Sequence, residues 1–235
     1  MTKMKTIGII GGMSWESTTE YYRIMNEEVK RRLGGLHSAN LVMKSFDFDQ
    51  VAQLQHDGDW ESITDLVTYA AQDLEIAKAD AIVIATNTIH KVAPRVQELI
   101  NIPIIHIGDA TAKAISADGY TTVGLLGTKF TMEGDFYSDR LQDYGIKTII
   151  PDSSGRDRVH RVIYDELCNG QINETSKRDF QRIINSLKRQ GAEGIVLGCT
   201  EIPLLIKKEH SSLPIYDTTK IHAMAAIDYA LRDNE

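Results

Sequence analysis

A cysteine and a threonine occupy matching positions in two similar segments of the chain. Residues 81–89 (AIVIATNTI) align one for one with residues 194–202 (GIVLGCTEI), which places Thr86 opposite Cys199. In each segment a short apolar run has the composition of a buried parallel strand, and the hydroxyl or thiol stands where that strand ends. A thiol can serve as a base or a nucleophile. Cys199 is therefore the first candidate for chemistry, and Thr86 becomes a candidate through its equivalence to Cys199.

Two more pairs of segments repeat at nearly the same interval. Residues 6–11 (TIGIIG) match 122–127 (TVGLLG), and 102–106 (IPIIH) match 213–217 (LPIYD). The separations are 199 − 86 = 113, 124 − 8 = 116 and 214 − 103 = 111 positions. Three ordered matches at one period indicate an internal duplication. We expect two similar lobes, residues 1–106 and 107–217, with Thr86 and Cys199 on opposite sides of one cleft.

Strand and helix patterns alternate along both halves, which predicts an α/β fold whose sheets are mostly parallel and flanked by helices. A last helix from about 218 to 233 could pack against the first lobe. The polar stretch from Asp47 to Trp60 is expected to be the longest loop. Ligands of such sheets bind beyond the carboxyl ends of the strands. The expected strands are 6–10, 41–46, 81–85, 121–126 and 194–198, with short ones near 103 and 215; the expected helices are 15–33, 61–78, 110–116, 132–143, 155–168 and 174–190, with others after 89 and 201.

Composition and charge exclude several classes of protein. The net charge of −7 argues against a nucleic acid or an anionic membrane as partner, because their phosphates would repel the chain. No stretch has the length and apolarity of a membrane span or a signal peptide, and the two cysteines suggest no disulfide framework. The seven histidines lack the spacing of a metal site, so no metal is expected, and His90 and His106 are interpreted as polar helix or strand-end residues. A cytoplasmic protein is expected.

The position of Cys199 makes it more than a small core residue. Thr200 and Glu201 are expected to begin a helix, whose N-terminus would lower the thiol pKa, while Glu201 would oppose that effect if it lay close. Cys168 falls inside a helical pattern without a counterpart in the repeat and is interpreted as structural. The glycines of residues 8–12 do not form a dinucleotide-binding G-x-G-x-x-G motif, although they would let backbone N–H groups approach an anion.

Four motifs together resemble the aspartate/glutamate racemase family: residues 8–17 (GIIGGMSWES), 85–90 (ATNTIH), 127–131 (GTKFT) and 198–201 (GCTE). The resemblance covers essentially the whole chain. It implies a pyridoxal-independent isomerase with two pseudo-symmetric α/β lobes, often a homodimer, that uses no cofactor and acts on a small acidic amino acid. One residue would remove the Cα proton and another would deliver a proton to the opposite face.

Most family members have cysteine at both catalytic positions, whereas this chain has Thr86 at the first. A subgroup specific for L-aspartate and L-glutamate resembles it in having Thr-Asn-Thr there. By that pattern Cys199 would act on the L-enantiomer and Thr86 would be the proton donor toward the D-product. The substrate contacts that the resemblance implies are Met13, Ser14, Gln55, Asn87, Thr88, Thr128, Thr131, Thr200 and Glu201.

Two alternatives stay open at this stage. A lone catalytic cysteine facing a residue without a thiol also resembles arylmalonate decarboxylases, and maleate isomerases and hydantoin racemases share the fold. A protein of a different class would bind a small acid without catalysis. The sequence does not rank aspartate against glutamate, since loop geometry shapes the pocket for the side chain.

Overall fold

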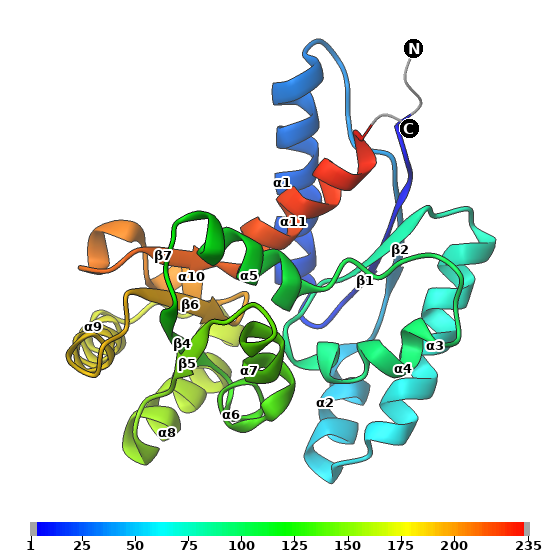
Figure 1. Ribbon diagram of the computed structural model, residues 1–235. Coiled ribbons are helices and arrows are strands. Elements are labelled where there is room, and N and C mark those ends of the chain that lie inside the picture. Colours follow the sequence, from blue (N-terminus) through cyan, green and yellow to red (C-terminus); the bar gives the residue numbers. More distant parts are fainter. Residues whose placement is uncertain (1–3, 233–235) are drawn as a thin grey trace. The chain divides into compact units, whose positions relative to one another are not determined.

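The computed structural model describes residues 4–232, which divide into two compact units. Unit 1 comprises the residues up to Ile107 and those from His222 onward, and unit 2 comprises Gly108–Ile221. Each unit contains a parallel sheet with helices against it (Figure 1). The predicted α/β class is therefore confirmed. The first residues of the predicted first lobe, 1–3, and the predicted helix end at 233 lie outside the described residues.

Unit 1 is built on a three-stranded parallel sheet of order β2-β1-β3, extended by one parallel bridge from Ile82 to Ile104. Ser14 caps the first helix by accepting a hydrogen bond from the Ser17 N–H group, and Gly34 ends it. The elements are β1 (Ile7–Gly11), α1 (Trp15–Leu33), β2 (Leu41–Ser45), α2 (Phe48–Asp57), α3 (Trp60–Ile76), β3 (Ala81–Ile84), the 3-10 turn η1 (Thr88–Lys91), α4 (Ala93–Gln97), the start of α5 (Ile107–Ala117) and most of α11 (Thr218–Ala230).

Alternating side chains of β1 and β3 enter two separate cores, one on each face of the unit 1 sheet. Ile9 and Val83 lie with apolar residues of α1 and α11, whereas Ile10 and Ile84 lie with those of α3 and α4. Figure 1 shows α1 and α11 on one side of β1 and α3 and α4 on the other. Because both faces are covered, the two strands are apolar throughout, as their sequences predicted.

Unit 2 has a four-stranded parallel sheet of order β5-β4-β6-β7. Helix α9 packs closely on β4, where a Cβ atom at Gly124 would come within 2.9 Å of a Leu187 methyl group. The elements are the rest of α5, β4 (Thr122–Gly127), α6 (Lys129–Glu133), α7 (Asp135–Gln142), β5 (Lys147–Ile149), α8 (Ser153–Arg161), the π-helical turn η2 (Val162–Glu166), the 3-10 turn η3 (Leu167–Asn169), α9 (Glu174–Arg189), β6 (Gly194–Gly198), α10 (Ile202–Leu205), the 3-10 turn η4 (Lys208–His210), β7 (Ile215–Asp217) and the start of α11.

The two sheets repeat one topology with one register. Gly8 pairs with Ile82 in unit 1, and Gly124 pairs with Ile195 in unit 2. The outer contact repeats as well, since Ile82 bridges to Ile104 as Ile195 pairs with Ile215. These are the same positions that the sequence repeat aligned. The structure thus bears out two pseudo-symmetric units.

An acidic side chain joins the starts of the two inner strands in each unit. An Asp80 carboxylate oxygen accepts a hydrogen bond of 2.6 Å from the Thr6 N–H group. In unit 2 a Glu193 oxygen accepts hydrogen bonds of 2.9 Å from the N–H groups of Thr121 and Thr122. The carboxylate therefore helps to set the register at the strand starts in both units.

The expectation of a long loop from Asp47 to Trp60 was wrong. Most of this stretch is the helix α2, capped by Asp47 and ended by Gly58 in the left-handed region at φ 72°. Its inward side chains, among them Val51, are spaced for one helical face. The sequence contained these signals, but its many polar residues outweighed them.

Several other boundaries differ from the prediction for local reasons. Pro103 precedes a single bridge rather than a strand, and β5 was not predicted. Gly134, in extended conformation, divides the expected helix 132–143 into α6 and α7. The expected helix 155–168 leaves α-helical geometry at Val162, where the π-helical turn begins.

We predict that unfolding free energy falls as the pH drops below about 6.5, because unit 1 buries the neutral His222. Burial lowers the pKa of His222 to about 4. Between these values the unfolded chain binds a proton that the folded chain does not, which costs up to about 1.4 kcal/mol per pH unit for this residue. Urea unfolding at pH 7.5, 6.0 and 5.0 measures the loss. His222→Gln should give a shallower dependence, and equal slopes in the two proteins would contradict the prediction.

Candidate functional site

Five of the six predicted site residues of unit 1 follow two neighbouring strands at their carboxyl ends. Met13 and Ser14 come after β1, and Thr86 comes after β3 with Asn87 and Thr88. The strands are held together at this level by a 2.8 Å hydrogen bond from the Ala85 N–H group to the Ile10 carbonyl. Four of these five side chains are buried, and Thr86 is half-buried.

The turn after β1 depends on Gly12. Its φ of +88° lies in the left-handed region, and a Cβ atom there would approach the Phe46 carbonyl oxygen to 2.2 Å. The Gly12 N–H group donates a 2.8 Å hydrogen bond to the Thr18 hydroxyl. The chain therefore turns tightly against β2 and enters α1 with Ser14 at its cap.

Gln55 comes from a helix and not from a strand end. It is buried in the last turn of α2, where its backbone carbonyl accepts a hydrogen bond from the Gly58 N–H group. Met13 contributes to the core beside α2 and α3. Within unit 1 the structure thus brings Ser14 and residues 86–88 to adjoining strand ends and leaves Gln55 on a helix.

Unit 2 repeats this arrangement at the ends of β4 and β6. Thr128 caps α6 by accepting a hydrogen bond from the Thr131 N–H group, and the two hydroxyls are 3.3 Å apart. Thr131 lies over the strand ends: a Cβ atom at Gly127 or Gly198 would be within 3.1 or 3.2 Å of its side chain. A side chain at either glycine would crowd Thr131 at the edge where Cys199 follows β6.

Cys199 is buried and donates a 2.8 Å hydrogen bond from its thiol to an oxygen of the Glu201 carboxylate. The Thr200 hydroxyl donates to the same oxygen at 2.9 Å. Burial, followed by the negative charge of Glu201, raises the pKa of the Cys199 thiol well above its ordinary value. The thiol is therefore protonated in this arrangement, and a carboxylate stands in contact to accept its proton.

The helix expected after residue 201 is α10, which begins at Ile202 and has four residues. Thr200 and Glu201 precede this helix and do not form its first turn, with Glu201 at the N-cap position. The fold therefore gives Cys199 a carboxylate neighbour in place of the pKa-lowering helix terminus.

The sequence did not single out Tyr164 and His160. Burial, with smaller effects from the nearby Cys199, Cys168 and Glu201, raises the pKa of Tyr164 to about 12. Its ring lies 4.8 Å from that of His160, and the Lys129 N–H group donates a 3.3 Å hydrogen bond to His160 Nδ1. Tyr164 belongs to the π-helical turn, and such turns occur frequently at functional sites. The turn had no signal in the sequence.

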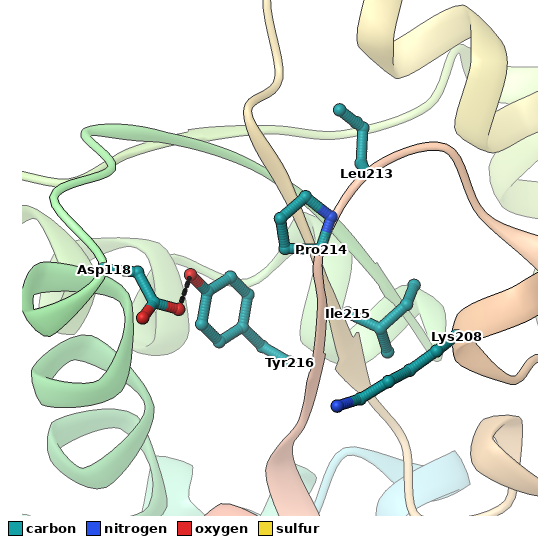
Figure 2. A pocket seen from close by; sticks show the side chains of 6 residues that line it. All are labelled: Asp118, Lys208, Leu213, Pro214, Ile215 and Tyr216. Atoms are coloured by element: carbon teal, nitrogen blue, oxygen red, sulfur yellow. Dashed lines mark hydrogen bonds between the residues drawn. The ribbon is translucent and has the colours of Figure 1, made fainter.

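A separate pocket of about 280 Å³ lies in unit 2 at the amino-terminal start of β7 (Figure 2). The Tyr216 hydroxyl closes one side by donating a 2.8 Å hydrogen bond to Asp118. This pocket is at the opposite end of the sheet from Cys199 and does not contribute to the candidate site. Its lining residues are Asp118, Lys208, Leu213, Pro214, Ile215 and Tyr216.

Within residues 4–232, no group of three or more histidine, cysteine or acidic side chains is arranged to hold a metal ion. None of the helices in that range has the length and apolarity to cross a bilayer.

Comparison with known proteins identifies the family of the chain. Residues 10–226 match the family described as Asp/Glu/Hydantoin racemase. A glutamate racemase of Hydrogenobaculum sp. is 27% identical over 194 residues, which span 77% of this chain and 72% of the relative. The broad specificity amino-acid racemase RacX of Bacillus subtilis is 22% identical over 233 residues, or 94% of this chain and 96% of RacX.

Solved structures extend the match to nearly the full length. A candidate Asp/Glu racemase from Yersinia pestis is 50% identical with a TM-score of 0.93, covering 97% of this chain and 100% of its own. An aspartate racemase homologue from Pyrococcus horikoshii is 36% identical with a TM-score of 0.86 and the same coverage. Because the family model matches most of its length and the solved structures share its fold, the chain belongs to the Asp/Glu/hydantoin racemase family, a family of isomerases.

Proposed function

We propose that this protein is a cofactor-independent racemase of aspartate, glutamate or both. Cys199 removes the Cα proton of the L-enantiomer, and Thr86 supplies a proton to the opposite face to give the D-enantiomer. The observation that carries the proposal is the Cys199–Glu201 contact at the end of β6, the strand equivalent to the one that Thr86 follows. Membership of a racemase family supports the reaction type.

A buried thiol is a poor base, and Glu201 compensates by accepting its proton. Thiolate is the basic form, and burial disfavours it. A carboxylate oxygen 2.8 Å from Sγ can accept the thiol proton, leaving thiolate to take the proton from Cα. The positive ammonium group of a bound amino acid would further favour thiolate. The Thr200 hydroxyl holds the receiving oxygen in place.

Charge that develops on the substrate carboxylate needs preorganised donors. In unit 1 the candidates are Ser14 and residues 86–88, and in unit 2 they are Thr128, Thr131 and Thr200. All follow carboxyl ends of parallel strands, where ligands of such sheets bind. These hydroxyl and amide groups suit a small anionic substrate without requiring a positively charged protein.

Thr86 makes the proposed acid–base pair unequal. An aliphatic hydroxyl is a much weaker acid than a thiol, so giving a proton leaves an alkoxide that water must neutralise. Enantiomers have equal free energy in water, so kcat/KM must be the same in both directions. The unequal acid–base pair therefore makes kcat differ between the two directions, and KM differs by the same factor.

Cys199→Ala should reduce exchange of the Cα proton by at least about 10²–10⁴-fold, because the base is removed. Proton NMR of L-aspartate and L-glutamate in D2O, without added cofactor and followed by chiral analysis, measures exchange and inversion. Cys168→Ala is the matched control, a second cysteine of unit 2, and should keep activity. Release of CO2, or binding without exchange in the wild-type protein, would contradict the racemase assignment.

Thr86→Cys should raise kcat and make it more similar in the two directions, because a thiol gives and takes protons more easily than a hydroxyl. Initial rates from pure L- and pure D-substrate supply the two kcat and KM values. Thr86→Ser, which keeps a hydroxyl at the same position and introduces no thiol, is the control. An unchanged kcat for the D-substrate would argue against Thr86 as the second acid–base residue.

Glu201→Gln should have two opposite effects. The pKa of Cys199 should fall, because a negative neighbour is removed, and alkylation by iodoacetamide at pH 7 should become faster. Cα exchange should nevertheless slow by roughly 10²-fold or more, because the proton acceptor is lost. Both are measured in a Cys168→Ala background, with the exposed Glu209→Gln as control. Faster exchange in Glu201→Gln would show that Glu201 only restrains the thiol.

A further inference from the structure

The half-buried His106 of unit 1 lies in a group with two buried histidines and a buried tyrosine, and two of these side chains bond to the backbone of Ile105 and Ile107. We call Tyr21, His90, His106 and His222 the histidine cluster. The ring centre of His90 is 4.6 Å from that of His106 and 5.4 Å from that of His222. Tyr21 lies on α1 and His222 on α11. The cluster thus joins both of those helices to the turn that follows β3.

His90 makes two hydrogen bonds that fix its protonation pattern. Its Nε2 accepts a 3.2 Å hydrogen bond from the Ile107 N–H group, so this nitrogen has no proton. Its Nδ1 then carries the proton and donates a hydrogen bond of 2.8 Å to the Thr86 carbonyl oxygen. The side chain is 1% exposed, and burial lowers its pKa well below the ordinary value, which keeps this neutral form.

His222 bonds to the same segment and has the opposite tautomer. Its Nε2 donates a 2.6 Å hydrogen bond to the Ile105 carbonyl, and its Nδ1 accepts one of 2.8 Å from the Tyr21 hydroxyl. Ile105–Ile107 is therefore a fixed support. His90 transmits that support to Thr86, whose own N–H group donates to the Ile84 carbonyl at 2.8 Å.

We propose that His90 is a positioning residue that orients Thr86 for proton delivery by tying the Thr86 carbonyl to the Ile107 N–H group. The contact fixes the peptide plane after Thr86 and with it the direction of the side chain. This role rests on the proposed function of Thr86. It predicts that a change at His90 affects the half-reaction at Thr86 more than the half-reaction at Cys199.

Two amide substitutions separate the two hydrogen bonds. An Asn amide reaches the place of Nδ1, so His90→Asn can still donate to the Thr86 carbonyl. A Gln amide reaches the place of Nε2, so His90→Gln can still accept from the Ile107 N–H group while losing the bond to Thr86. Tyr21→Phe is the matched control, since it removes a buried hydrogen bond of the same cluster without touching Thr86.

The measurement is the partition of L-substrate in D2O between D-product and Cα-deuterated L-substrate. Cys199 alone can produce deuterated L-substrate, whereas D-product also needs Thr86. His90→Gln should lower the ratio of D-product to deuterated L-substrate by about 10- to 100-fold, the effect of a misplaced catalytic group. His90→Asn should recover most of the loss, and Tyr21→Phe should keep the wild-type ratio.

The results distinguish a failure of the role proposed for His90 from a failure of the proposed racemase function. If both products fall equally in His90→Gln, His90 has only a structural role and the inference is overturned. If the wild-type protein shows no exchange, the proposed function fails and the role of His90 fails with it. Should the variants not fold, long-range ¹H–¹⁵N spectra of the labelled wild-type protein decide. A proton on Nδ1 of His90 supports the inference, and a proton on Nε2 overturns it.

Discussion

Parallel pairing of two apolar strands in each unit determines where the candidate residues that follow those strands lie. In unit 1 this is β1 with β3, and in unit 2 it is β4 with β6. Paired parallel strands of similar length end at the same level, so the polar residues after them gather at one edge. Glycines at the strand ends, such as Gly127 and Gly198, allow the following side chains to lie directly over that edge. The chemistry thus depends on a register that apolar packing and two acidic side chains maintain.

The two strand ends offer their reactive groups under different electrostatic conditions. The Cys199 thiol donates a hydrogen bond to the Glu201 carboxylate, which can accept its proton. The turn bearing Thr86 is held instead by a neutral histidine that contacts the backbone. A duplicated fold can therefore keep the position of a reactive side chain while changing what surrounds it.

The two-unit fold and the equivalence of Thr86 and Cys199 could be predicted because the sequence repeats itself at a nearly constant interval. The repeat aligned Thr86 with Cys199, and the structure confirms the equivalence through strand pairs such as Gly8–Ile82 and Gly124–Ile195. What could not be predicted depends on tertiary contact. The π-helical turn that places Tyr164 near Cys199 has no residue signature, and the hydrogen bond from Ile107 to His90 joins residues 17 positions apart in the chain. Helix α2 was missed for another reason. Its capping residues Asp47 and Gly58 are present in the sequence, but the many polar residues between them suggested a loop.

The order of the chain has a consequence for its synthesis. Unit 2 is one continuous segment, but unit 1 needs the residues from His222 onward. Until they leave the ribosome, the face of the unit 1 sheet that bears Ile9 and Val83 lacks the alanines of α11 that complete its core. Unit 2 can therefore fold during translation, whereas unit 1 waits with an apolar surface exposed. Truncation near the C-terminus would damage the half of the protein that is made first.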